Sequence, residues 1–308
     1  MKKEKGFLTG VAILASGLAL AAVLGLTIAE IAPDRATVVL GKLRGKITVA
    51  QGCSVFSRGI FDAKREEDAA EPTVRLAKND GPIALFETPL GPTWFQLNGG
   101  TLPELVAESQ ADVYRIRAGM VQPGDVVLDI GANVGTVTRD ALRAGAKLVV
   151  AVEPEPTTLE CLRRNLQREI SSGRVIVVPK GAWDADSTLP LHIDPNPLGS
   201  SLVLGGRGAR TIMVPLVTID EIVAELRLEK VDFIKMDIEG AESHALLGAS
   251  QTLRKFHPRM SLELEHHTED TDELPRIARE IWPAYKAEFT PCTITGRIIH
   301  PEVALLRP

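Results

Sequence analysis

The chain has 308 residues, a formal net charge of −5 and 44% hydrophobic residues. This length and apolar share fit a globular protein with a sizeable core. The negative charge, without interleaved basic and aromatic runs, gives no electrostatic reason to expect a nucleic-acid partner. Cys53, Cys161 and Cys292 lie far apart, which matches neither a disulfide framework nor a zinc cluster, so we expect reduced thiols.

The amino end predicts a membrane anchor. Residues 6–29 contain no charged side chain and follow three lysines, Lys2, Lys3 and Lys5. A stretch of this length can cross a hydrocarbon core as a helix, so we predict a single transmembrane helix within residues 1–30. A cleaved signal peptide with a small-residue site at 19–21 is the alternative. The apolar stretch continues beyond that site, which favours the anchor.

Residues 31–82 are expected to be a linker or juxtamembrane region, and 83–308 the main domain. The charge run at 64–68 is typical of a solvated surface and receives no function. Two short strands are predicted around the Gly-Pro turn in 86–95, followed by a helix over 102–117.

From residue 126 onward, apolar runs alternate with helical patterns. The runs predict core strands at 126–128, 148–152, 175–178, 231–236 and 260–264, with a further strand at 214–217. Segments 284–290 and 303–306 can add antiparallel strands at an edge. This alternation predicts an α/β fold, a Rossmann-like doubly wound and mostly parallel sheet.

The most informative motif follows the first of these strands. Gly131 and Gly135 allow a sharp turn before a helix whose free N–H groups can face a ligand. About 20 residues on, Glu153 ends the next apolar run, where a carboxylate can accept hydrogen bonds from two ribose hydroxyls. The third glycine of a dinucleotide fingerprint is missing, and Asp129 and Asn133 offer polar groups for a methionine end. The motif therefore favours S-adenosylmethionine over NAD.

Backbone at Gly181 and Ala182 follows the third strand closely enough to approach an adenine ring. The neighbouring Trp183 can stack there or pack in the core. The Gly-rich loop at 199–208 can cover an acceptor or be an ordinary surface loop.

A second constellation follows the strand at 231–236. Asp237, Glu239 and Glu242 crowd a strand-to-helix turn, and His266 follows the last parallel strand. Asp237, Glu239 and His266 are our candidate catalytic residues, because clustered titratable groups at the carboxyl edge of a sheet suit proton removal. His244 is a further candidate base. A metal cluster of His266 and His267 with Asp237 and Glu239 is an alternative, but the spacing matches no strong metal signature, so no metal is predicted.

These segments resemble the FkbM-type methyltransferase family. The resemblance rests on Asp129-Ile-Gly-Ala-Asn-Val-Gly135, Val152-Glu-Pro154, Lys235-Met-Asp-Ile-Glu-Gly-Ala-Glu242 and Leu262-Glu-Leu-Glu265. It implies a class I methyltransferase fold and transfer of a methyl group from S-adenosylmethionine, usually to an oxygen of a sugar or natural product. It also implies that Asp129, Gly131, Asn133 and Gly135 hold the methionine portion and Glu153 the ribose.

We therefore expect a methyltransferase acting on a hydroxyl of a small-molecule or lipid-linked acceptor. An NAD(P)-dependent oxidoreductase on the same fold and a noncatalytic membrane scaffold are the alternatives. Positive charges flank the apolar stretch on both sides, so they do not fix its orientation. Because S-adenosylmethionine is made in the cytosol, we expect the catalytic domain on that side of the membrane.

Overall fold

The computed structural model describes residues 48–49, 73–97, 101–193, 200–204, 210–264, 266–267, 269–295 and 298–308. The chain divides into two compact units, one of Met1–Phe61 with Pro291–His300 and one of Asp62–Thr290 with Pro301–Pro308. A three-stranded sheet is formed by β1 (Thr48–Val49), β15 (Ile298–Pro301) and β14 (Cys292–Thr295), with β1 parallel to β15. The second unit contains the features described below.

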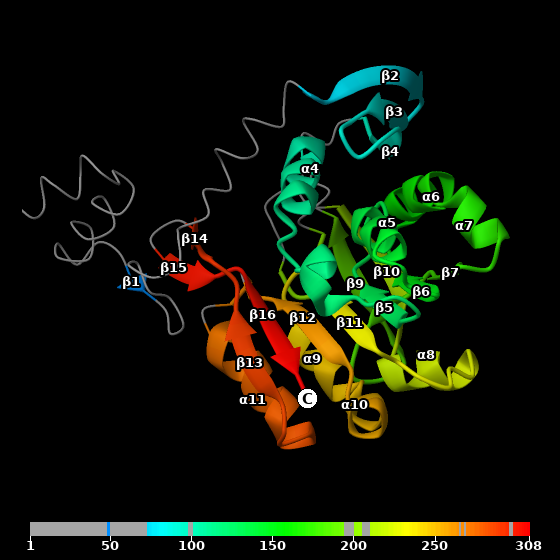
Figure 1. Cartoon of the computed structure of the whole chain (residues 1–308). Coiled ribbons are helices and arrows are strands. Elements are labelled where there is room, and N and C mark those ends of the chain that lie inside the picture. Colours follow the sequence, from blue (N-terminus) through cyan, green and yellow to red (C-terminus); the bar gives the residue numbers. More distant parts are fainter. Residues whose placement is uncertain are drawn as a thin grey trace, which may run out of the picture. The chain divides into compact units, whose positions relative to one another are not determined.

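A sheet of seven strands is the centre of the second unit (Figure 1). In spatial order these are β13 (Lys286–Phe289), β16 (Val303–Arg307), β12 (Arg259–Glu263), β11 (Phe233–Met236), β5 (Val126–Ile130), β6 (Leu148–Val152) and β7 (Val175–Val178). The strands from β12 to β7 are parallel, while β16 and β13 are antiparallel to their neighbours. The predicted doubly wound, mostly parallel sheet is therefore confirmed.

Both faces of this sheet are covered, and β5 shows how. Leu128 and Ile130 belong to a core cluster that includes buried side chains of four helices. These are α8 (Ile219–Glu225), α9 (Glu242–Leu247), α10 (Ser250–Phe256) and α11 (Asp270–Ile281). Asp129 points the other way, since side chains alternate along a strand, and there it contacts Thr138 of α5 (Thr136–Arg143). Burial of the whole of β5 follows from this double cover.

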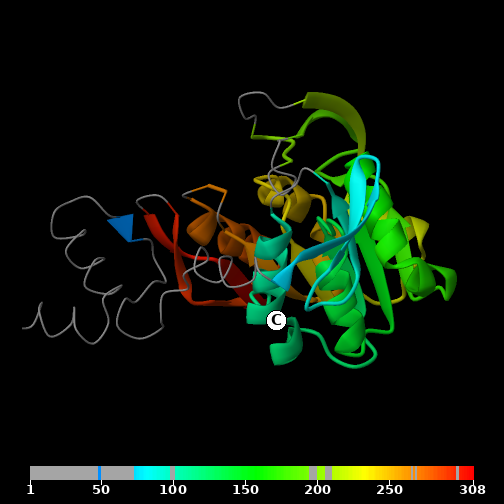
Figure 2. The ribbon, with the colours of Figure 1, turned by 90° about the horizontal axis from the view of Figure 1, so that it is seen from above.

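Two smaller sheets flank the central one (Figure 2). One is antiparallel and contains β2 (Arg75–Asp80), β3 (Ile83–Glu87) and β4 (Thr93–Gln96). β2 falls within the region expected to be a linker. The other contains β8 (Gly181–Ala182), β10 (Arg210–Val217) and β9 (Ser187–Ile193). The strand expected at 214–217 thus lies in a separate sheet, where half of β10 is exposed, unlike a central parallel strand.

The helix expected over 102–117 is shorter. α4 (Leu102–Ala111) ends because Asp112 is left-handed, with φ 54°, and its carboxylate accepts from the backbone N–H groups of Arg117 and Ala118. A π-helical turn, η2 (Ile116–Met120), follows. After β6 the chain forms α6 (Pro156–Asn165) and α7 (Gln167–Ser171).

Within the described residues, no helix has the length and apolarity needed to span a membrane. The predicted anchor at residues 6–29 and the charge run at 64–68 lie outside the described residues, so the anchor stays a prediction. Cys161 is free and buried, as expected. Cys292 is disulfide-bonded, so the expectation of a reduced thiol is wrong there.

Candidate active site

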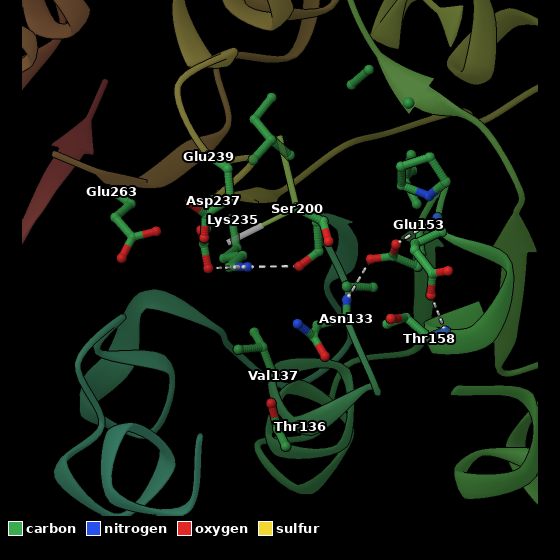
Figure 3. A pocket seen from close by; sticks show the side chains of 18 of the residues that line it. Asn133, Thr136, Val137, Glu153, Thr158, Ser200, Lys235, Asp237, Glu239 and Glu263 are labelled. Carbon is green, nitrogen blue, oxygen red and sulfur yellow. Dashed lines mark hydrogen bonds and ion pairs between the residues drawn. The ribbon is translucent and has the colours of Figure 1, made fainter. Parts of the chain in front are cut away.

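A cavity of about 300 Å³ lies at the carboxyl ends of β5, β6, β11 and β12 (Figure 3). β5 is the first of the parallel strands along the chain, and it lies between β6 and β11. The strands β6 and β7 are added on one side of β5 and β11 and β12 on the other, so the strand order reverses at β5. Such a switch point is where open α/β sheets bind ligands. Eight of the ten predicted site residues line the cavity: Gly131, Asn133, Glu153, Gly181, Ala182, Asp237, Glu239 and His266.

The turn after β5 is tight because two backbones meet there. Gly131 has φ 79°, and a Cβ added to it would lie 1.8 Å from the carbonyl oxygen of Asp237. The glycine therefore permits close approach of two strand ends, in addition to forming the cavity wall. Asn133 is also left-handed, with φ 49°, and its side-chain oxygen accepts from the N–H of Val134 at 2.7 Å. Asparagine tolerates this conformation better than most residues.

Glu153 is held at the cavity wall by backbone N–H groups. Its Oε2 accepts from the N–H of Asn133 at 3.0 Å and its Oε1 from the N–H of Glu155 at 2.8 Å. The residue is 7% exposed, and burial raises the pKa of its carboxyl to about 7, although these hydrogen bonds oppose the shift. Its carboxylate faces the cavity in Figure 3, as expected of a group that accepts from hydroxyls.

Two predicted cofactor residues do not line the cavity. Asp129 is fully buried within β5, because the strand continues to Ile130, and its Oδ2 accepts from the Thr138 hydroxyl at 2.5 Å. Gly135 is the left-handed N-cap of α5, where an added Cβ would lie 2.7 Å from Leu166. The direct contacts expected of Asp129 and Gly135 are thus corrected to contacts that position the turn and α5.

The candidate adenine region contains Gly181 and Ala182 but not Trp183. The Trp183 ring stacks on His244 at 3.8 Å, and His244 in turn contacts Asp184 at 2.5 Å. Neither Trp183 nor His244 lines the cavity, so the packing interpretation of Trp183 is correct and His244 is poorly placed as a base.

Asp237 is fixed by two donors that the sequence did not identify as functional. The Tyr114 hydroxyl donates to its Oδ2 at 2.8 Å, and the Lys235 ammonium donates to the same oxygen at 3.1 Å. Burial alone would raise the pKa of Asp237, but Lys235 and these hydrogen bonds hold it below its usual range. Lys235 also donates to the Gly131 carbonyl at 2.9 Å, which ties β11 to the turn after β5.

Glu239 and His266 form an ion pair on the cavity wall. His266 Nε2 lies 3.0 Å from Glu239 Oε2. Burial alone would lower the pKa of His266, but Glu239 and Glu242 raise it to about 9, so the imidazole is protonated at neutral pH. Glu239 has a left-handed backbone with φ 57°, an uncommon conformation for a residue with a long side chain.

Lys235 and Tyr114 were not predicted as site residues, but the sequence contains an indication of Lys235. Lys235 is a charged residue inside an otherwise apolar strand, and such a residue needs a buried partner. Tyr114 has no such indication, because it follows α4 and its partner Asp237 lies 123 positions away in the sequence.

The rest of the cavity wall combines neutral residues with further acidic side chains. Besides the residues above, it includes Glu104 and Glu108 of α4 and the Glu155 cap of α6, with Ser200 and Leu202 from the predicted acceptor loop. Among the described residues, acidic side chains therefore outnumber the basic ones of the wall, Lys235 and His266, although burial raises the pKa of Glu108 well above its usual value. A ligand with a net positive charge, such as a sulfonium bearing an amino acid, fits this wall.

The family model described as "Methyltransferase FkbM domain" matches residues 129–285 of the chain. The chain belongs to the FkbM methyltransferase family. The resemblance inferred from the motifs is confirmed, and residues 129–285 match the methyltransferase domain of this family, whose methyl donor is S-adenosylmethionine. The family match contradicts the oxidoreductase alternative, whereas the scaffold alternative requires an activity measurement.

Several curated methyltransferases are similar to it. The hexuronic acid methyltransferase AglP of Haloferax volcanii is 26% identical over 148 residues, 48% of this chain and 59% of AglP. The 31-O-demethyl-FK506 methyltransferase FkbM of Streptomyces tacrolimicus is 28% identical over 196 residues, 54% of this chain and 75% of that protein. The 2-O-methyltransferase NoeI of Sinorhizobium fredii is 29% identical over 152 residues, 44% of this chain and 61% of NoeI. The chain thus spans less than two thirds of AglP and of NoeI.

A solved structure of a methyltransferase FkbM from Methylobacillus flagellatus is 19% identical, with a TM-score of 0.46. The match covers 68% of this chain and 54% of that one.

Proposed function

We propose that the enzyme methylates a hydroxyl oxygen of a saccharide or natural product, either free or linked to a lipid. The observation that carries this proposal is the Glu239 carboxylate on the cavity wall, close to the turn that begins at Gly131. An alcohol is a weak nucleophile until a base removes its proton, so oxygen methylation needs such a group. The names of the relatives support the choice, since two of them specify an O-methyl position.

The cofactor is assigned to the half of the cavity between β5 and β7. When bound, S-adenosylmethionine supplies a methyl group on a positively charged sulfur. Gly131 and Asn133 would hold its methionine portion, Glu153 would accept from its ribose hydroxyls, and backbone at Gly181 and Ala182 would border its adenine. The acidic wall favours the positive charge of this ligand.

Among the three candidate catalytic residues, Glu239 is best suited to accept the proton. The lowered pKa of Asp237 makes it a weak base, and His266 is already protonated at neutral pH. The acceptor O–H bond would break with its proton passing to Glu239. The oxygen would then be free to take the methyl group that S-adenosylmethionine supplies when bound, with the electron pair of the carbon–sulfur bond remaining on sulfur. His266, at 3.0 Å, steadies the Glu239 carboxylate before that transfer.

Asp237 instead acts as a fixed charge. Lys235 and Tyr114 hold its carboxylate in one orientation. A carboxylate fixed in this way would orient the acceptor or the methyl donor beside it. Precise placement of reacting groups contributes a large part of the rate in transfer reactions.

Glu239→Gln tests the assignment, because the amide keeps the size of the side chain and removes its basicity. With labelled methyl donor and a screen of saccharides and membrane lipids as acceptors, we expect kcat to fall at least about 100-fold. Affinity for S-adenosylmethionine should stay close to that of the unaltered enzyme. Glu160→Gln, an exposed change on α6, is the matched control. Full activity of Glu239→Gln, together with loss of activity in Asp237→Asn, would move the base role to Asp237.

A further inference from the structure

Three side chains with metal-ligating atoms meet at one end of the cavity. Asp237, Glu263 and His266 each offer one such atom, and these atoms lie within 4.8 Å of one another. All three residues line the cavity, and Figure 3 shows Asp237 and Glu263 in its wall. No metal signature in the sequence marks the group. Parallel pairing of β11 with β12, with Met236 opposite Leu262, brings the two strand ends together.

Acidic side chains outnumber basic ones around this group in the described part of the chain. Among the described residues, Asp237 and Glu263 lie with Glu239 and Glu242 near one ammonium, that of Lys235, and one imidazole, that of His266. Lys235 is further shared with Asp129, whose Oδ1 lies 3.9 Å from its Nζ. Asp237 and Glu263 also hydrogen-bond to one another, which requires a proton shared between the two carboxyls. A divalent cation would take the place of that proton.

Unused ligand atoms at His266 and Glu242 give a second, independent indication. The His266 side chain is nine-tenths buried, and its Nδ1 has no hydrogen-bond partner among the described residues. Glu242 is 1% exposed, and its Oε2 likewise has no hydrogen-bond partner in the part of the chain that the structure describes. The other oxygen of Glu242 lies 3.6 Å from His266 Nδ1. Buried polar atoms without partners often mark the place of an ion or a water.

We propose that Asp237, Glu263 and His266 bind one divalent cation of the Mg²⁺ or Mn²⁺ type. Two carboxylates and an imidazole match the preferences of Mn²⁺, and a cation of this type keeps open positions for oxygen ligands from outside the protein. Because His266 is protonated at neutral pH without the cation, binding would release this proton, and the cation and the proton compete for the ring. The absence of a thiolate in the group disfavours the softer metals. Glu239 stays outside the ligand set, so it remains available to accept a proton.

This cation would define the acceptor, an inference that rests on the proposed function. A cation with open positions binds two adjacent oxygens of one molecule, such as a vicinal diol or an α-hydroxy carboxylate of a sugar. It would also offset the repulsion between an acidic acceptor and the carboxylates of the wall. The substrate class is therefore a molecule that chelates through the hydroxyl to be methylated and the oxygen beside it.

Electron paramagnetic resonance of Mn²⁺ with the purified full-length enzyme tests the site directly. We expect one bound Mn²⁺ per chain, displaced by Mg²⁺, with nitrogen modulation of the echo signal from a coordinated imidazole. His266→Asn should abolish the nitrogen modulation. Glu263→Gln should weaken Mn²⁺ binding at least about 10-fold, since a charged ligand is lost. Glu269→Gln, an exposed change nearby, should bind Mn²⁺ like the unaltered enzyme.

Binding of S-adenosylmethionine to the same variants shows whether they are folded. No stoichiometric Mn²⁺ binding by the unaltered enzyme, or bound Mn²⁺ without nitrogen modulation, would overturn the proposed ligand set. Methyl transfer to a hydroxyl that persists at full rate in a strong chelator would also overturn it, while the proposed function would stand. Conversely, bound Mn²⁺ with no transfer to any hydroxyl would leave the site intact and contradict the proposed function.

Discussion

The ionisation of Glu153 sets the pH range in which the cofactor is held. Burial raises the pKa of this carboxyl to about 7, so the group is increasingly protonated below that pH. Ribose hydroxyls donate best to the ionised form, and binding therefore favours it. We predict full affinity for S-adenosylmethionine above pH 7 and a decline below it that approaches tenfold per pH unit. Calorimetric titration between pH 5.5 and 8.5 measures this.

Glu153→Gln separates this carboxyl from the others in the cavity. The variant should bind S-adenosylmethionine more weakly by about 1–3 kcal/mol, because two hydroxyls lose a charged acceptor. Its affinity should also lose the dependence on pH. Glu160→Gln should keep the profile of the unaltered enzyme. A pH dependence that survives in Glu153→Gln would assign it to another group.

We predict that an alanine at Gly131 lowers the free energy of unfolding more than an alanine at a glycine with free space around it. Gly131 and Gly173 have similar backbones, with φ 79° and φ 75°, but a Cβ at Gly173 meets nothing within 4 Å. Gly173→Ala should therefore cost only the strain of a left-handed residue, about 1–2 kcal/mol. Gly131→Ala adds a clash with the Asp237 carbonyl and should cost at least about 2 kcal/mol more. Urea unfolding of the two variants gives this difference, and equal losses would contradict the close approach.

At the scale of elements, Lys235 joins β11 to β5. The residue is 2% exposed and lies between the carboxylates of Asp129 and Asp237. Lys235→Met would leave those charges without a cation, which in buried pairs costs about 3–5 kcal/mol of unfolding free energy. Lys230→Met, at a half-exposed position with an ion pair to Asp232, should cost less than about 1 kcal/mol. Urea unfolding midpoints compare the two.

A double variant shows how much of the unfolding free energy lost in Lys235→Met comes from the unpaired charge of Asp129. Adding Asp129→Asn to Lys235→Met removes the fully buried charge that was left alone, so part of the lost stability should return. Additive losses in the two variants would mean that the Lys235–Asp129 contact at 3.9 Å carries no coupling.

Strand ends were predictable from sequence because a parallel strand buried on both faces is a continuous apolar run. Glu153 and Asp237 were located in this way, each directly after such a run. Elements with mixed burial were harder to assign. β10 is exposed along its first half and mostly buried along its second and joins a separate sheet, and α4 ends at Asp112 through a side-chain contact to the following turn. Contacts over long sequence separations, such as Tyr114 with Asp237, leave no local pattern to read.

At the scale of the whole molecule, two features favour opposite locations for the catalytic domain. S-adenosylmethionine is made in the cytosol, which places a working methyltransferase there. The disulfide at Cys292, however, is typical of oxidising compartments. We propose the cytosolic placement, with residues 6–29 as the anchor, because catalysis depends on the supply of the methyl donor.

The final prediction tests this topology. The full-length enzyme should sediment with membranes and resist carbonate extraction, because an apolar stretch of this length inserts as a helix. Deletion of residues 1–29 should release it to the soluble fraction. A reporter fused after Pro308 should be active only in its cytosolic form, and thiol labelling of the native chain shows whether Cys292 is oxidised there. A chain shortened near Ala21 would establish a signal peptide instead. An active exported reporter would contradict the cytosolic placement and require a source of methyl donor outside the cytosol.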